Sequence, residues 1–142
     1  MKRISRSAIV ECSAQEFYGL VEAIESYPEF LSWCRAAEVL ERKPGRTVAR
    51  LTLGVPGVKQ SFMTENTNVP GESIDMRLLE GPFSHFSAAW RFTALGPGAC
   101  KAEYSMEYEF SSGLVAAVLE PVFKRIADST VDAFTKRIAR AR

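Results

Sequence analysis

The pattern of hydrophobic and polar residues predicts one long helix at the end of the chain. Between Gly113 and Arg142, apolar side chains recur every three or four positions, which places them on one face of a helix. The positions of this face are Val115, Leu119, Phe123, Ile126, Thr130, Phe134 and Ile138. Such a helix would be roughly 40 Å long, so we expect it to need a broad apolar surface beneath it. Pro121 either kinks the helix or marks the start of its second part.

The middle of the chain changes to a period of two, which indicates β-strands. Together with a moderate pattern near the N-terminus, alternating segments predict strands near residues 3–11, 36–42, 47–55, 58–67, 73–80, 86–94 and 100–110. Pro-Gly and Gly-Pro pairs separate neighbouring strands at hairpin spacing. The last of these strands alternates most regularly, with apolar residues from Cys100 to Phe110 between polar ones, and this is typical of an antiparallel strand with one buried face.

Two short helices are expected after the first strand. Ser13 and Glu16 have the spacing of a capping box, in which each side chain bonds a free backbone N–H of the other residue. The apolar face of this first helix is Phe17, Leu20, Val21 and Ile24. Because the residue before a proline avoids the helical region, the helix should end near Tyr27, and Pro28 suits the first turn of a second helix. That second helix would carry Phe30, Leu31 and Trp33.

This order of elements predicts an α+β fold in one domain spanning residues 1–142, with a curved antiparallel sheet and all helices on one face. The inward strand faces mix large and small residues, which can leave an apolar pocket between sheet and helix or pack into a filled core. The residues expected to line this space are Leu53, Phe62, Met76, Leu78, Phe86, Trp90, Tyr104, Met106, Tyr108, Leu119, Phe123, Ile126 and Phe134. Phe30 and Trp33 are expected to form a lid, with ordinary packing as the alternative.

Composition and charge exclude several classes of protein. A net charge of +1 gives no overall electrostatic attraction to DNA or membranes. Basic residues gather at both ends of the chain, and they would form one patch if the termini lie close together; otherwise they are a solvated tail and favourable charges at a helix C-terminus. They are Lys2, Arg3, Arg6, Lys136, Arg137, Arg140 and Arg142. No segment has the length of a signal-peptide core or a membrane span, so we expect a cytoplasmic protein with at most peripheral membrane contact.

Candidate chemistry is sparse. The three cysteines have no metal-binding spacing and the chain has one histidine, so we expect buried, reduced thiols and no metal site. A catalytic triad could be assembled only through His85, and we assign no catalytic residue and no catalytic cofactor. Tyr104 and Tyr108 could donate hydroxyl hydrogen bonds to a ligand carbonyl, or they could be half-buried aromatic residues with hydroxyls at the rim.

A set of motifs in a fixed order resembles the coenzyme Q-binding branch of the START-like superfamily. The motifs are Tyr27-Pro-Glu-Phe30-Leu31-Ser-Trp33-Cys34, Phe62-Met-Thr64-Glu-Asn66, Gly81-Pro82-Phe83, Trp90-Arg-Phe92 and Tyr108-Glu-Phe110. The resemblance extends from about residue 3 to residue 140. Bacterial members of this branch include ribosome association toxins, and other members are labelled oligoketide cyclase or lipid transport protein.

The resemblance implies a helix-grip fold, in which a seven-stranded antiparallel sheet curls around the C-terminal helix. It further implies non-enzymatic binding of ubiquinone or another isoprenoid lipid in the tunnel between sheet and helix, in support of respiratory electron transport near the inner membrane. One alternative is a toxin of a toxin–antitoxin pair that binds the large ribosomal subunit and blocks translation initiation, with Lys136, Arg137 and Arg140 as the basic contact. A second alternative is a polyketide cyclase or dehydratase.

Overall fold

The computed structural model describes residues 1–54, 57 and 60–140 of the chain, and it confirms the predicted order of elements. The strands and helices are β1 (Lys2–Val10), α1 (Ala14–Glu22), the 3₁₀ helix η1 (Ile24–Glu29), β2 (Cys34–Lys43), β3 (Arg46–Leu53), β4 (Ser61–Val69), β5 (Ser73–Glu80), β6 (Phe83–Gly96), β7 (Ala99–Phe110) and α2 (Gly113–Arg140). The strands form one antiparallel sheet in the order β1-β7-β6-β5-β4-β3-β2.

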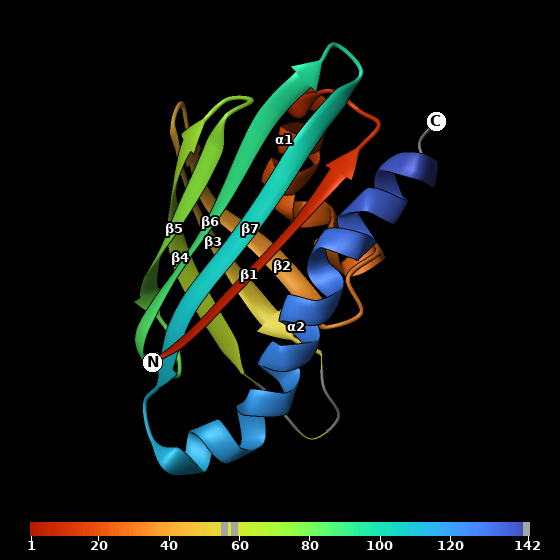
Figure 1. Cartoon of the computed structure of the whole chain (residues 1–142). Coiled ribbons are helices and arrows are strands. Elements are labelled where there is room, and N and C mark those ends of the chain that lie inside the picture. Colours follow the sequence, from red (N-terminus) through yellow and green to blue (C-terminus); the bar gives the residue numbers. More distant parts are fainter. Residues whose placement is uncertain (55–56, 58–59, 141–142) are drawn as a thin grey trace.

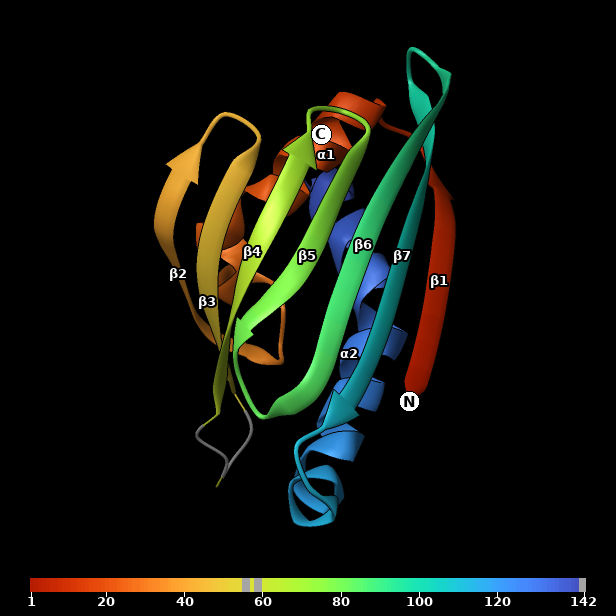
Figure 2. The same ribbon diagram turned by 90° about the vertical axis from the view of Figure 1, so that its left-hand side faces the viewer.

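The helices lie on one face of the curved sheet, as predicted. Figure 2 shows the sheet from its outer side, with α1 and α2 behind it. α2 crosses the inner face, and Figure 1 shows its first turns at a steep angle to the rest of the helix. Pro121 lies inside the helix, and a proline there removes one backbone hydrogen bond and clashes with the preceding turn. The change of direction therefore agrees with the expected kink.

The start of the first predicted short helix is confirmed, but α1 ends at Glu22 and not near Tyr27, and Ile24 is the first residue of η1. The second helix was predicted too far along the chain. The Ser13 hydroxyl accepts a hydrogen bond from the Glu16 N–H at 3.1 Å, which completes the capping box of α1. The next helix is η1, which ends at Glu29 with Pro28 in its interior. A single 3₁₀ turn tolerates Pro28 because it needs few backbone hydrogen bonds. Phe30, Leu31 and Trp33 consequently lie in the loop before β2.

The strand predictions are confirmed with shifted boundaries. β6 begins at Phe83, earlier than predicted, and β4 is described only from Ser61 onward. The predicted strand positions Val55, Val58 and Lys59 lie outside the described residues. Buried and exposed residues alternate along β4, β6 and β7, so the period of two did identify the face that packs against α2.

Within the described residues the two ends of the chain lie apart, so the condition for one basic patch is not met. Lys2 Nζ lies 3.0 Å from Glu120 Oε1, and Arg6 Nη2 lies 2.9 Å from Asp128 Oδ1, so β1 and α2 run in the same direction. The start of β1 is therefore beside the first half of α2, and the last turns of α2 lie at the other end of the molecule (Figures 1 and 2).

Candidate functional site

The residues predicted to line the interior lie together between the sheet and α2. Met76 and Leu78 are half-buried and pack against the core, and the other predicted lining residues are buried. Strands β3 to β7 supply one wall and the buried side of α2 supplies the other. The sequence therefore identified the correct surface, and the arrangement of side chains within it could be seen only in the structure.

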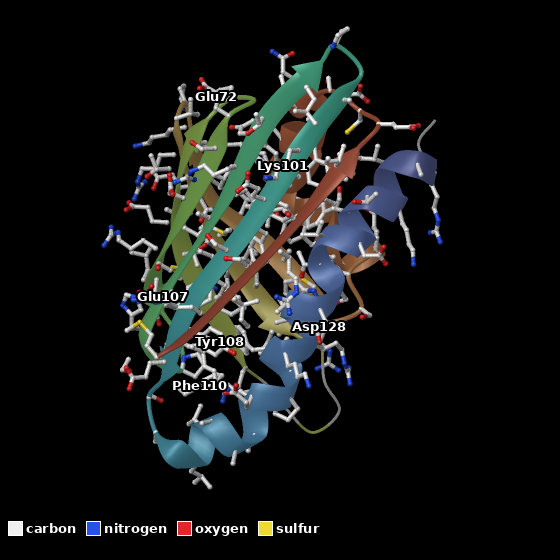
Figure 3. The ribbon with its side chains drawn as sticks, viewed as in Figure 1. Glu72, Lys101, Glu107, Tyr108, Phe110 and Asp128 are labelled. Carbon is white, nitrogen blue, oxygen red and sulfur yellow. The ribbon has the colours of Figure 1, made fainter. Side chains whose placement is uncertain are left out.

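A first aromatic cluster fills the end of this space next to the start of α2. Its members are Phe62, Phe83, Phe86, Tyr108, Phe110 and Phe123. The rings of Phe83 and Phe123 are 5.1 Å apart and perpendicular, a favourable edge-to-face contact. Figure 3 shows Tyr108 and Phe110 at the end of β7 near the first turns of α2.

Phe83 belongs to this cluster although the alternating pattern did not predict it as a lining residue. It is 7% exposed, and its ring lies 5.0 Å from that of Phe86, three positions further along β6. Two residues three positions apart normally point to opposite faces of a strand. The β6–β7 register shifts between Phe83 and His85, and such a bulge turns both rings inward. No signal in the alternation alone could have shown this irregularity.

A second aromatic cluster surrounds Phe134 at the opposite end of the interior. Its members are Phe17, Tyr18, Tyr27, Phe30, Trp90, Phe92, Tyr104 and Phe134. Phe134 contacts Phe30 at 5.1 Å and Trp90 at 5.4 Å between ring centroids. Phe30, one of the two predicted lid residues, thus covers this cluster from the loop before β2. Trp33, the other, is 5% exposed.

A row of small and flexible side chains separates the two clusters. The strand registers place Asn66, Met76, Ala88, Met106 and Ile4 next to one another across β4, β5, β6, β7 and β1, and we call these residues the cross-strand row. Among the described residues, no aromatic ring contact joins the first cluster to the second. Methionine adapts its shape readily and alanine occupies little volume, so Met76, Ala88 and Met106 make the middle of this row adaptable.

Several polar atoms of the interior lack a strong hydrogen-bond partner. Trp33 Nε1 is buried and has none within the described part of the chain. The hydroxyl of Tyr104 donates to the sulfur of Met106 at 3.6 Å, and a thioether is a weak acceptor. By contrast, Thr64 Oγ1 has a normal partner, because it donates a hydrogen bond to Asn66 Oδ1 at 2.8 Å. An unpaired buried donor is unfavourable, so Trp33 Nε1 is suited to a hydrogen bond with an acceptor that enters the interior.

The ionisable groups of the interior remain protonated near neutral pH. Burial raises the pKa of Tyr104, and it raises the pKa of Tyr108 to about 12 with a further contribution from the Glu120 carboxylate. Burial also raises the pKa of the Cys34 thiol to about 11. Neutral hydroxyls can donate hydrogen bonds to a bound molecule but are poor general bases. The interior is therefore better suited to holding a ligand than to removing its protons.

The remaining titratable residues do not form a second interior site. His85 Nε2 lies 3.1 Å from Glu107 Oε1, and Glu107 lies between the inward residues Met106 and Tyr108, so the pair is on the outer sheet face (Figure 3). A hollow of about 320 Å³ on that face is lined by Ser5, Ser87 and Ser105, and also by Ile4, Met76, Ala88 and Met106 of the cross-strand row. Within residues 1–54, 57 and 60–140, no group of three His, Cys, Asp or Glu side chains could hold a metal ion.

Two of the three predicted basic contact residues are paired with carboxylates. Lys136 Nζ lies 3.0 Å from Asp132 Oδ2, and Arg137 Nη2 lies 2.6 Å from Glu29 Oε1, whereas Arg140 is exposed. Their positive charge is thus partly compensated on the protein itself. In the described part of α2 and of the other helices, no segment is long and apolar enough to cross a membrane.

Comparison with known proteins gives one family match and several close relatives. The model of the polyketide cyclase/dehydrase and lipid transport family matches residues 10–135. The ribosome association toxin RatA of Pseudomonas aeruginosa is 41% identical over 134 residues, covering 94% of this chain and 93% of that protein. The mitochondrial coenzyme Q-binding protein COQ10 homolog B of Xenopus laevis is 29% identical over 145 residues, covering 98% of this chain and 59% of that protein.

A solved structure shows the same fold. A START superfamily protein from Mycobacterium smegmatis superposes with a TM-score of 0.83 at 20% sequence identity, covering 99% of each chain. The agreement extends over the curved sheet and the long terminal helix, and it confirms the helix-grip fold that the family resemblance implied.

Proposed function

The chain belongs to the polyketide cyclase/dehydrase and lipid transport family, in the branch that includes ribosome association toxins and coenzyme Q-binding proteins, and on this premise we propose that it binds a prenylated quinone between its sheet and α2. Binding is the whole activity in this proposal. The protein holds and transfers a ligand such as ubiquinone, in support of electron transport, and performs no chemistry on it.

The observation that carries the proposal is the cross-strand row between the two aromatic clusters. Between Phe123 and Phe134, the buried residues of α2 are Ile126, Ala127, Thr130 and Val131, and two of these four side chains are small. Met76 and Met106 occupy this space in the structure, so a ligand enters when their side chains change rotamer. Burial of an isoprenoid tail there would provide about 25 cal/mol for each Å² of apolar surface removed from water.

Two hydrogen-bond donors of the interior would orient the quinone ring. A quinone has two carbonyl oxygens and no hydrogen-bond donor, so it requires donors from the protein. Trp33 Nε1 lacks a partner within the described residues, and the Tyr104 hydroxyl has only a weak one in Met106 Sδ. A few directed hydrogen bonds in an otherwise apolar pocket are the usual source of ligand orientation.

The test is direct detection of the ligand. The protein is purified from cells without detergent, extracted with organic solvent, and the extract is analysed for quinones by mass spectrometry; the purified protein is then titrated with a short-chain ubiquinone while tryptophan emission is followed. We expect co-purified quinone and saturable quenching. A chain that carries no quinone and shows no saturable response would rule the proposal out.

A pair of neighbouring alanines supplies matched variants for this test. Ala88 is 6% exposed and belongs to the cross-strand row, whereas Ala89, the next residue of β6, is less buried and alternates to the outer face of the sheet. Ala88→Leu fills the row and should abolish quinone binding, while Ala89→Leu should leave it unchanged. The melting temperature of each variant shows whether it is folded. Equal affinity in the two folded variants would contradict binding at the row.

A second candidate is association with the large ribosomal subunit, and the RatA similarity of 41% identity supports it. Its test is co-sedimentation with purified large subunits, and growth arrest when the chain is overproduced. Replacing Lys136, Arg137 and Arg140 by Gln should then abolish both effects, because phosphate contacts depend on such cations. Absence of co-sedimentation at low salt would remove this candidate without affecting the quinone proposal.

A further inference from the structure

The first turns of α2 carry an apolar stripe that faces solvent. Leu114, Ala117, Val118 and Pro121 are exposed and have the spacing i, i+3, i+4, i+7, so they share one face of the helix. Leu114 is 80% exposed and Val118 is 51% exposed. We call these four residues the exposed stripe. Leu119, on the other side of the same turns, is buried in the core.

The exposed stripe is continued by two free cations. Lys124 and Arg125 follow Pro121 on the same side of α2, and both are exposed. The nearby carboxylates are already engaged, because Glu120 pairs with Lys2 and Asp128 pairs with Arg6. Among the described residues, Lys124 and Arg125 have no ion-pair partner. This part of α2 therefore presents an apolar surface next to a local positive charge.

The start of β1 adds to the same end of the molecule. Met1 is 62% exposed, and with Gly113 and Ala116 it lines a hollow of about 270 Å³ beside the first turn of α2. Figure 1 shows the N-terminus and the first turns of α2 at this end, where the helix turns outward from the sheet. Leu114 and Val118 thus lie on an exposed face of the helix at the same end as the hollow that Met1 lines.

From this arrangement we propose that the first turns of α2 dock the protein on a membrane surface containing anionic lipids. Leu114, Val118 and Met1 would enter the boundary between headgroups and acyl chains, while Lys124 and Arg125 would contact the lipid phosphates. Apolar residues on one face with flanking cations are the chemical requirement of an interfacial helix, and charge complementarity favours anionic over neutral lipid. This surface is separate from the interior, so the proposal goes beyond quinone binding.

The experiment is vesicle flotation with phosphatidylcholine vesicles prepared with and without phosphatidylglycerol, both free of quinone. We expect the protein to float with the vesicles that contain phosphatidylglycerol and to be released at high salt, because salt screens exposed charges. Binding to neither vesicle overturns the proposal. Equal binding to both overturns the role of Lys124 and Arg125. Since no quinone is present, these outcomes are independent of the proposed ligand.

Variants on the exposed stripe test the position of the contact. Leu114→Gln with Val118→Gln should weaken vesicle binding by about tenfold or more, and Lys124→Gln with Arg125→Gln should do so only for anionic vesicles. Val118→Trp should strengthen binding, because tryptophan favours the membrane interface. Leu95→Gln and Lys101→Gln are the matched controls, since both residues flank the β6–β7 turn and have exposed side chains. Figure 3 shows Lys101 at the other end of the molecule from the first turns of α2.

The competing explanation for the exposed stripe is a contact between two copies of this chain. Sedimentation velocity distinguishes such a dimer from membrane docking. If the stripe is a contact between copies, Leu114→Gln with Val118→Gln converts a dimer into a monomer and vesicle binding is absent in every variant. That result would overturn membrane docking. A monomeric wild-type chain whose flotation depends on the stripe would support it. All substituted side chains are exposed or at the surface, so folded variants are expected, and their melting temperatures verify this.

Discussion

Arg137 Nη2 lies 2.6 Å from Glu29 Oε1, and the guanidinium group of the same arginine lies 5.1 Å above the ring centroid of Phe30. These contacts connect the last turns of α2 to the loop that follows η1, across 108 positions of the chain. Phe30 in turn packs against Phe134. One arginine therefore holds the predicted lid residue against the helix that it covers.

Removing this arginine should loosen the lid. We expect Arg137→Gln to lower the free energy of unfolding by about 1 kcal/mol, because both the cation–π contact and the ion pair are lost. Glu29→Gln keeps Arg137 above Phe30 and should cost about 0.5 kcal/mol or less. Urea unfolding measures both values. Equal losses would show that the ion pair alone stabilises the contact.

Trp33 Nε1 has no hydrogen-bond partner within the described residues, so we expect replacement of Trp33 to change ligand affinity more than protein stability. Trp33→Phe removes a buried donor that has no partner within the described residues, so stability should change by about 1 kcal/mol or less. If that donor binds a quinone carbonyl, the affinity for a short-chain ubiquinone should fall by about tenfold. Tyr104→Phe should reduce affinity in the same direction. Unchanged affinity in both variants would exclude these two groups as ligand donors.

A close backbone approach makes Gly81 difficult to replace. A Cβ atom at Gly81 would lie 2.8 Å from Phe62 Cβ, inside the first aromatic cluster, whereas a Cβ at Gly98 would meet nothing within 4 Å. We expect Gly81→Ala to destabilise the fold by about 2 kcal/mol, because Phe62 must move. Gly98→Ala should change the free energy of unfolding by no more than about 0.5 kcal/mol. Thermal unfolding compares them, and similar values for the two variants would refute the packing argument.

The ion pair between Glu25 and Arg42 predicts how stability depends on acid. Hydrogen bonding to Arg42 lowers the pKa of Glu25 from 4.5 to about 2. A carboxyl group with a lowered pKa in the folded state adds stability above its unfolded pKa and loses it as the pH falls. The free energy that ionised Glu25 contributes to folding should therefore disappear as the pH falls from 4.5 to about 2. Glu25→Gln should reduce the slope of unfolding free energy in this range, measured by urea unfolding, and Arg42→Gln should have the same effect. An unchanged slope in both would contradict the assignment.

The elements that depend on local sequence could be predicted correctly. The capping box fixed the start of α1, the proline–glycine turns separated the strands, and the spacing of three and four identified the buried side of α2. These signals involve neighbours a few residues apart. The second short helix was predicted at the wrong position because the apolar spacing of Phe30, Leu31 and Trp33 fits a helix. In the structure these residues lie in a loop and pack against the core.

The internal organisation of the site depends on contacts between distant residues. The cross-strand row exists because the registers of β4 to β7 place Met76 beside Ala88 and Ala88 beside Met106, and no single strand contains this information. The inward direction of Phe83 depends on a bulge in the pairing of β6 with β7. The lack of a hydrogen-bond partner for Trp33 Nε1 within the described residues depends on side chains that are distant in sequence. The sequence therefore supported a list of lining residues but not their division into two aromatic clusters.

The position of β1 has a consequence for how the chain is made. β1 comes before the other described strands along the chain, yet in the described part of the sheet it pairs with β7 alone, with Lys2 opposite Tyr108. Nascent β1 must therefore remain unpaired until β7 (Ala99–Phe110) has been translated, and such non-local pairing makes folding slow. Most side chains of β1 are exposed and several are charged, and these charges would protect the unpaired strand from aggregation.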